Sequence, residues 1–188
     1  MIEIRNISKT FGGKQVLNNV SFSVKKGECV AIMGRSGIGK TTLLRIIAGL
    51  EAPDTGEVVF SENAKKTFVF QENRLLENKS VIENILAVAP DRKKAEYFLE
   101  RCLLSEDKNK KAGALSGGMK RRLAIARALS FGGEIYFLDE PLRELDESTL
   151  EETAKLIKEE ISGKTAILIT HDEASAKMLS DRIIYIGE

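Results

Sequence analysis

The sequence is poor in the residues that build disulfides and zinc sites, with one histidine and two cysteines among 188 residues. Cys29 and Cys102 are far apart in the chain, and each lies in an apolar segment. Two cysteines in this arrangement make neither a disulfide framework nor a metal-binding pair. A structural zinc site of Cys and His ligands cannot be built, and we expect both thiols to be buried in the core.

Long hydrophobic runs are also missing. The apolar runs at residues 29–33, 135–138 and 166–169 are far shorter than the about 20 residues that span a bilayer. The first six residues alternate like a strand and lack the basic and apolar regions of a secretion signal. We therefore expect a cytoplasmic protein without a transmembrane segment.

Neither sign of charge dominates, because the sequence contains 29 Lys and Arg residues and 28 Asp and Glu residues. This balance gives no general attraction to nucleic acid or acidic lipid. The basic cluster at residues 120–122 falls in a helical pattern, and we interpret it as a solvated helix face. At 43% hydrophobic and 30% charged residues, the composition is that of an ordinary folded protein of one domain.

The sequence does contain an alternation of strand and helix patterns. Residues 1–60 are rich in strand patterns, and from Leu115 a long helix is followed by strand, helix, strand and a last strand near residues 183–186. This order implies parallel strands with helical crossovers, hence an α/β fold. Residues 73–111 predict a helical insert. One apolar face of that insert is expected to contain Ala95, Phe98, Leu99, Cys102 and Leu103.

The strongest local signal is Gly-Arg-Ser-Gly-Ile-Gly-Lys-Thr at residues 34–41, which fits the P-loop pattern. An apolar strand ends at Met33 and a helix pattern follows Gly39, so backbone N–H groups converge on a volume that favours phosphate. Lys40 can neutralise the β and γ phosphates, and Thr41 can ligate Mg²⁺. The alternative is a glycine-rich turn that binds nothing. The predicted nucleotide contacts here are Gly34, Arg35, Ser36, Gly37, Ile38, Gly39, Lys40, Thr41 and Thr42.

Polar residues directly follow three further apolar runs: Gln71, the pair Asp139 and Glu140, and His171. The carboxyl ends of parallel strands share one edge, so these groups are expected beside the nucleotide. In extended chain, Asp139 and Glu140 point to opposite sides. One carboxylate can hold Mg²⁺ through water while the other orients or deprotonates the attacking water. The alternatives are a turn before Pro141 and, for the lone Gln and His, structural roles.

Residues 115–119, Leu-Ser-Gly-Gly-Met, with Lys-Arg-Arg-Leu-Ala-Ile-Ala-Arg-Ala-Leu after them, resemble the signature motif of ABC ATPases and its helix. Ser116, Gly117 and Gly118 would cap a long helix and offer a second phosphate site. In the family, the signature of one copy closes over ATP held by the P-loop of another. The resemblance covers nearly the whole chain and identifies it as an ATP-binding and hydrolysing ABC transporter subunit.

The resemblance implies the ABC ATPase fold within the α/β class. This is a P-loop NTPase with a mostly parallel sheet core, an N-terminal antiparallel β portion and a small helical subdomain. Residues 1–188 would form a single domain. Residues 1–72 and 131–188 would make the RecA-like core with its β portion, and about 73–130 the helical subdomain with the signature motif.

The resemblance also implies contact roles for three residues. Phe11 resembles the aromatic residue that stacks on adenine, with the alternative that it packs on the sheet. Gln71 resembles the glutamine that contacts Mg²⁺ and faces the transmembrane partner. Asp146 resembles the aspartate of the loop that crosses the dimer interface.

Further resemblances imply the catalytic groups. Asp139 resembles the magnesium-linked aspartate, Glu140 the catalytic glutamate and His171 the switch histidine at the γ-phosphate. The implied metal ligands are Thr41, Gln71 and Asp139, and the implied catalytic residues are Glu140, His171, Lys40 and Gln71.

The forms of the motifs, including Phe-Gln-Glu-Asn-Arg-Leu-Leu at residues 70–76, look like those of nitrate, sulfonate and taurine importers. The implied partners are a second copy, in a homodimer that sandwiches ATP, and transmembrane permease subunits that provide the only membrane contact. The implied location is peripheral to the inner face of the cell membrane, with no nucleic acid bound. Arg143 and Glu144 depart from the family, which has small residues there.

Three alternatives stay open. One is the ATPase of an ABC exporter. Another is a soluble ABC protein acting on ribosomes or DNA, although such proteins commonly carry two ATPase units or long coiled insertions. The last is a P-loop kinase, which leaves the motif at residues 116–119 unexplained.

Overall fold

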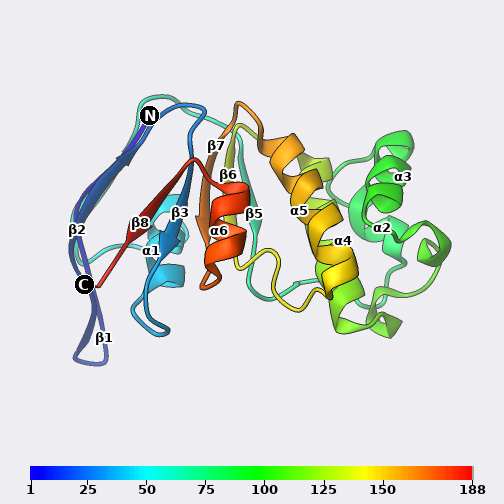
Figure 1. Ribbon diagram of the computed structural model, residues 1–188, viewed down its shortest axis with the longest axis horizontal. Coiled ribbons are helices and arrows are strands. Elements are labelled where there is room, and N and C mark those ends of the chain that lie inside the picture. The colour runs from blue at the N-terminus through cyan, green and yellow to red at the C-terminus, as the bar shows by residue number, and fades with distance from the viewer. Residues whose placement is uncertain (188) are drawn as a thin grey trace.

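The computed structural model describes residues 1–187 and places two sheets and a group of helices side by side (Figure 1). The strands are β1 (Ile2–Phe11), β2 (Lys14–Val24), β3 (Cys29–Met33), β4 (Thr55–Phe60), β5 (Lys66–Val69), β6 (Ile135–Asp139), β7 (Thr165–Ile169) and β8 (Arg182–Tyr185). The α-helices are α1 (Lys40–Ala48), α2 (Val81–Leu86), α3 (Arg92–Arg101), α4 (Gly117–Phe131), α5 (Glu147–Ile161) and α6 (Glu173–Leu179). Two short 3₁₀ turns are η1 (Ser105–Asp107) and η2 (Ala112–Ala114).

The central sheet has five strands in the order β5-β6-β7-β3-β8, and every neighbouring pair is parallel. Every residue of β3, β6 and β7 is buried, because both faces of the sheet are covered. Alternate residues pack into two separate cores: Ala31 faces one and Ile32 the other. The expected parallel core is confirmed.

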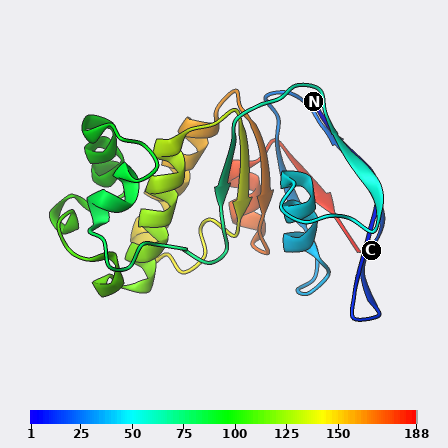
Figure 2. The same ribbon diagram turned by 180° about the vertical axis from the view of Figure 1, so that it is seen from behind.

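The two cores correspond to the two faces of that sheet. On one face, α1 and the antiparallel sheet pack against the strands, as the view in Figure 2 shows. On the other face, residues of α4, α5 and α6 share a core with the helices α2 and α3. The buried Cys29 and Cys102 belong to this second core, as predicted.

The N-terminal strands form a separate antiparallel sheet in the order β2-β1-β4. Its inward residues, Ile2, Ile4 and Ile7, are at most 2% exposed. A bulge interrupts the pairing of β1 with β4, where Gly56 has φ 88 and a Cβ would lie 2.3 Å from the carbonyl oxygen of Arg5. Only glycine fits this close approach.

The helices α2, α3 and α4 lie together at the end of the molecule away from the antiparallel sheet (Figure 1). Ser80 and Glu83 form a capping box at the start of α2, which satisfies two otherwise unpaired N–H groups. Ala95, Phe98 and Leu99 of α3 are buried as expected. The expectation for Leu103 is wrong: this residue follows the helix in a left-handed conformation, φ 55, and is 57% exposed.

None of the helices within residues 1–187 is long and apolar enough to cross a bilayer.

Candidate functional site

The P-loop joins β3 to α1, as the sequence predicts. Gly39 is the N-cap of α1 with φ 98, and a Cβ there would lie 2.7 Å from the carbonyl oxygen of Val16. A glycine is therefore required for the loop to pass under the β2 strand. The N-terminus of α1 is left with backbone N–H groups that no side chain caps, which suits an anion.

Lys40 is held inside the curve of the loop. Its ammonium group donates hydrogen bonds to the carbonyl oxygens of Gly34 at 2.8 Å and Arg35 at 3.0 Å, and the residue is 8% exposed. A buried ammonium bonded only to neutral carbonyls lacks a counter-charge. A phosphate group in the loop would supply one.

Asp139, at the end of β6, points toward the start of α1. Its carboxylate accepts a hydrogen bond from the Thr41 hydroxyl at 3.3 Å. The pKa of Asp139 is raised mainly because burial disfavours the charged form, while the bond from Thr41 opposes this shift. Within residues 1–187, no three His, Cys, Asp or Glu side chains cluster as a metal site. One carboxylate with a hydroxyl nevertheless fits Mg²⁺, which commonly takes few protein ligands and the oxygens of phosphate groups.

Glu140 turns away from Asp139 to the other side of the site. Its backbone is left-handed, φ 50, so the expected extended geometry is wrong here, although the two side chains do separate. The Glu140 carboxylate lies 3.0 Å from Nδ1 of His171, which follows β7. His171 is 71% exposed at its side chain, so its ring reaches solvent while one nitrogen engages Glu140.

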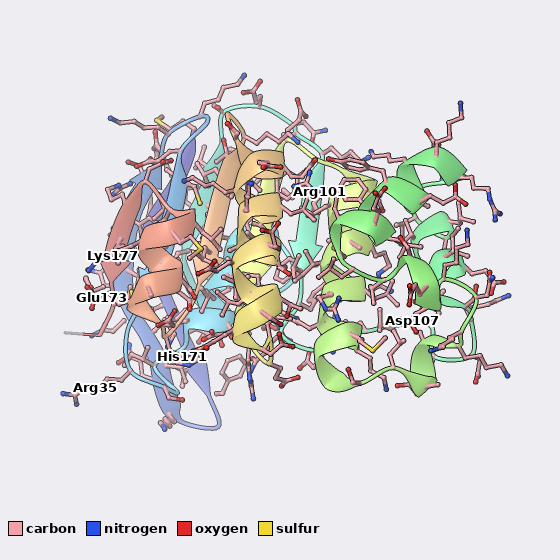
Figure 3. The ribbon with its side chains drawn as sticks, turned by 45° about the vertical axis from the view of Figure 1, so that its right-hand side comes forward. Arg35, Arg101, Asp107, His171, Glu173 and Lys177 are labelled. Carbon is pink, nitrogen blue, oxygen red and sulfur yellow. The ribbon has the colours of Figure 1, made fainter. Side chains whose placement is uncertain are left out.

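The structure brings the ends of the four strands to one depression. It is lined by Ser36, Lys40, Gln71, Glu140, Arg143 and His171. A second depression shares Ser36, Lys40, Gln71 and Glu140 with it and adds Val16, Gly37, Gly39, Thr41, Thr42 and Ile169. Figure 3 shows His171 and Arg35 at the same lower end of the molecule.

Three predicted loop residues, Gly34, Arg35 and Ile38, do not line these depressions. Arg35 is exposed and extends into solvent (Figure 3). The Ile38 side chain packs on the core beneath the antiparallel sheet. Gly34 lies against the carbonyl oxygen of Ile186. Any contact of these three with a phosphate would be made by their backbones.

The signature residues lie apart from the P-loop of the same chain. Ser116 caps α4 by accepting a hydrogen bond from the Met119 N–H at 3.3 Å. Ser116, Gly117 and Gly118 line none of the depressions at the P-loop. A Cβ on Gly118 would lie 3.2 Å from the carbonyl oxygen of Glu144. The N-terminus of α4 therefore faces outward. It lies beside Arg143 and Glu144, the two residues that differ from the small residues of the family.

Phe11 and Asp146 are also outside the depressions. Phe11 is 48% exposed at the tip of β1, with the ammonium of Lys9 5.2 Å from its ring centroid. The ring is therefore about half open to solvent. Asp146 is the N-cap of α5, and its carboxylate accepts hydrogen bonds from Ser148 and Thr149.

The solvated helix face expected at residues 120–122 is wrong for Arg121. This residue is 2% exposed, and its guanidinium donates to backbone carbonyls at the ends of β5 and β6. The charge is tolerated because those carbonyls satisfy it.

Sequence reasoning also missed three residues of the depressions, Val16, Ile169 and Arg143. Arg143 adds a cation beside Lys40 and His171. Its side chain is 48% exposed, and its Nε lies 3.5 Å from the Glu144 carboxylate. Val16 precedes the buried Leu17 in β2, and no pattern in the sequence marks it.

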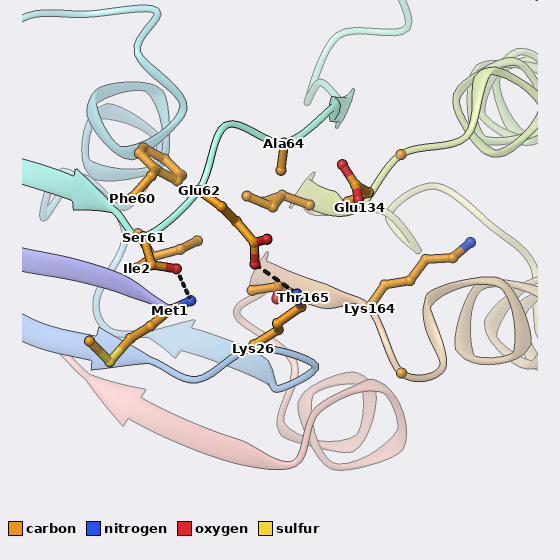
Figure 4. A pocket seen from close by; sticks show the side chains of 13 residues that line it. Met1, Ile2, Lys26, Phe60, Ser61, Glu62, Ala64, Glu134, Lys164 and Thr165 are labelled. Carbon is orange, nitrogen blue, oxygen red and sulfur yellow. Dashed lines mark hydrogen bonds and ion pairs between the residues drawn. The ribbon is translucent and has the colours of Figure 1, made fainter.

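A further depression lies at the opposite, amino-terminal edge of the central strands (Figure 4). Lys26 pairs with Glu62 there at 2.8 Å, and the Met1 ammonium donates to Ser61 at 2.8 Å. It contains none of the predicted site residues.

A P-loop that begins a helix, an acidic residue bonded to the P-loop threonine, and a glutamate after the same strand define a P-loop nucleoside triphosphatase. Comparisons with known proteins identify the branch. The profile of a family described as ABC transporter matches residues 17–143. The chain belongs to this family, and it binds and hydrolyses ATP.

Two relatives illustrate the match. The aliphatic sulfonates import ATP-binding protein SsuB 1 of Shouchella clausii is 43% identical, over 98% of this chain and 76% of that protein. The spermidine/putrescine import ATP-binding protein PotA of Mycoplasma mycoides subsp. mycoides is 35% identical, over 100% of this chain and 59% of that protein. These findings confirm the predicted family.

A solved structure confirms the fold. The dimeric post-hydrolysis state of the ATP-binding cassette MJ0796, bound to ADP and Pi, has a TM-score of 0.88 at 34% identity. The match covers 98% of this chain and 94% of that one. The α/β P-loop fold of ABC ATPases, predicted from the motifs, is therefore correct.

Proposed function

We propose that this chain is the ATPase subunit of an importer for a small solute of the nitrate, sulfonate and taurine kind. The observation that carries the ATPase role is the convergence of Lys40, Gln71, Glu140 and His171 on one depression at the P-loop. The names of the SsuB relatives support import and a sulfonate-like substrate. No observation favours export or a role on ribosomes or DNA.

Within this proposal, catalysis is electrostatic. The Lys40 ammonium and the N–H groups of the P-loop bind the β and γ phosphates. Thr41, Asp139 and Gln71 would hold Mg²⁺, which supplies positive charge against the phosphate oxygens. Thr42 and Ser36 add hydroxyl donors at the rim.

The water that attacks the γ-phosphate is oriented by Glu140. Nδ1 of His171 restrains the Glu140 carboxylate, and the exposed remainder of the imidazole is available to the γ-phosphate. Arrangement of a bound water in this way lowers the barrier by avoiding reorganisation during the reaction. Asp139 stays with Thr41 on the metal side.

The proposal includes a second copy of the chain. The N-terminus of α4, with Ser116, Gly117 and Gly118, would close over ATP bound to the partner's P-loop. The dimeric state of the cassettes with the same fold supports this arrangement. Asp146 would lie at the interface and Phe11 would stack on adenine.

The remaining partner is a permease in the membrane. The side chain of Gln71 is exposed beside the helical segment. It would contact the permease and change position with the bound nucleotide. The chain would therefore work at the inner face of the cell membrane, touching it only through the permease. We also propose the division into a core, residues 1–72 and 131–188, and a helical subdomain, about 73–130.

The test is phosphate release from Mg-ATP by the purified chain at a series of protein concentrations. The rate per chain should rise with concentration, because the site is completed by a second copy. Lys40→Ala should abolish release, while Lys93→Ala on the surface of α3 should not change it. Turnover that requires an added phosphoryl acceptor would contradict the proposal and favour a kinase. Uptake of an alkanesulfonate by permease vesicles, dependent on this chain, tests the importer assignment.

A further inference from the structure

Arg121 connects the helix of the signature motif to the two loops that follow β5 and β6. Its side chain leaves α4 little more than one turn after Ser116. The guanidinium donates to five backbone carbonyl oxygens: Phe70 at 2.6 Å, Gln71 at 3.2 Å, Asp139 at 2.8 Å, Glu140 at 2.8 Å and Pro141 at 3.0 Å. A longer contact reaches the side chain of Asn73 at 3.4 Å.

These bonds fix the backbone at Glu140. Its φ of 50 lies in a region that costs free energy for residues with a Cβ, so surrounding contacts must hold it there. The Glu140 N–H donates to Ile169 at 2.9 Å, and its carbonyl accepts from Arg121. With both sides of the residue tied, the carboxylate is directed at His171 and the P-loop.

Arginine is the side chain suited to this position. Five carbonyls that converge at a buried point need several donors in a planar fork, and a lysine ammonium offers only three from one atom. Burial lowers the pKa of Arg121 to about 10, so the group is still cationic at neutral pH. Neighbouring Arg122 donates instead to Cys102 and Leu103, away from both loops.

We propose that Arg121 is a positioning residue for hydrolysis, which holds the Glu140 and Gln71 loops in register with α4 and so couples the signature helix to the catalytic carboxylate. Arg121 itself does not touch the nucleotide. The inference rests on the proposed ATPase function. In this proposal Arg121 links two parts of the site. One is the N-terminus of α4, which would contact the nucleotide of the partner copy, and the other is the Glu140 carboxylate, which orients water at this chain's own nucleotide.

The test compares Arg121→Lys with Arg122→Lys, a matched change one residue away. In Arg121→Lys, kcat for ATP should fall about 10²-fold, because a catalytic group displaced by roughly 1 Å loses rate on this scale. KM and the equilibrium affinity for Mg-ATP should change far less than kcat, since Lys40 and the P-loop keep their contacts. Arg122→Lys should keep kcat.

A spectroscopic readout separates positioning from stability. The chain contains one histidine, so untagged protein gives a single imidazole Cε1–H NMR signal, from the ring that contacts Glu140. That signal should shift in Arg121→Lys and stay in place in Arg122→Lys. If Arg121→Lys does not fold, Arg121→Gln, which retains two amide donors, serves in its place.

An unshifted histidine signal together with full kcat in the Arg121 variant would overturn the inference. Loss of affinity for Mg-ATP in parallel with kcat would also overturn it, because the role would then be general stability. Failure of the proposed function is a different result, absence of ATP hydrolysis by the unmodified chain.

Discussion

Nδ1 of His171 lies 3.0 Å from both carboxylate oxygens of Glu140. The two residues follow neighbouring parallel strands, β7 and β6, and therefore meet at one edge of the sheet. The contact restrains a carboxylate that is 13% exposed at its side chain, whereas the imidazole remains largely open to solvent. A ligand at the P-loop can thus meet a carboxylate whose direction is already set, as the proposed catalytic role of Glu140 requires.

Removal of this contact should slow hydrolysis more than binding. For His171→Ala we expect kcat to fall by about 10²-fold, because the Glu140 carboxylate loses the contact that positions it. Affinity for Mg-ATP should change little, because Lys40 and the loop N–H groups are untouched. Steady-state kinetics and equilibrium binding measure the two effects. Lys177→Ala on exposed α6 is the control, and a loss of affinity equal to the loss of kcat would contradict the assignment.

Lys40 should control affinity. In Lys40→Ala the counter-charge to the phosphates is lost, and a hydrogen bond to a charged group is worth about 1.5–3 kcal/mol, which is roughly 10-fold to 10²-fold in the dissociation constant. Calorimetry with Mg-ATP measures this loss. Unchanged binding would mean that the loop at residues 34–41 is not the phosphate site.

Ser116 should be needed for hydrolysis in a dimer but not for ATP binding by a single chain. Ser116→Arg places a long cation at the exposed N-terminus of α4, where it would block closure over the partner's nucleotide. We expect hydrolysis to be lost while the monomer binds ATP as before. Ser105→Arg, at another exposed serine of the helical segment, should retain activity. Full turnover by Ser116→Arg would argue against a signature that acts on a second copy.

The sequence predicted those features that are local or periodic. The P-loop, the four strand ends and the N-cap Ser116 each depend on neighbouring residues, and the parallel sheet then places them. Arg121 was assigned to solvent because charge patterns describe exposed helices. Its burial depends on carbonyls about 20 and 50 residues away. Likewise, the left-handed backbone of Glu140 arises from tertiary bonds, which no sequence pattern marks.

A pH-dependent contribution to stability is expected from Glu28. Its carboxylate accepts a hydrogen bond from Arg182 at 2.8 Å, and this bond is the main reason that the Glu28 pKa lies below its ordinary value of 4.5. A lowered pKa stabilises the fold above the ordinary value, and this stabilisation is lost as the pH falls through the lowered pKa. Because the pair is partly solvated, it is worth at most about 1 kcal/mol.

Urea unfolding of Glu28→Gln and of the unmodified chain from pH 7 to pH 3 measures this contribution. The variant should be less stable at pH 7, and the difference should shrink below about pH 4.5. A difference that stays constant across this range would show that the contribution is packing and not charge.

The molar mass of Glu140→Gln by light scattering, with Mg-ATP and then with Mg-ADP, tests the central claim that two copies complete one site. The substitution keeps the size of the side chain but removes the carboxylate that we propose orients the attacking water, so ATP should persist and hold two copies together. We predict a dimer with Mg-ATP and a monomer with Mg-ADP. A monomer with both nucleotides would contradict a site shared between two copies.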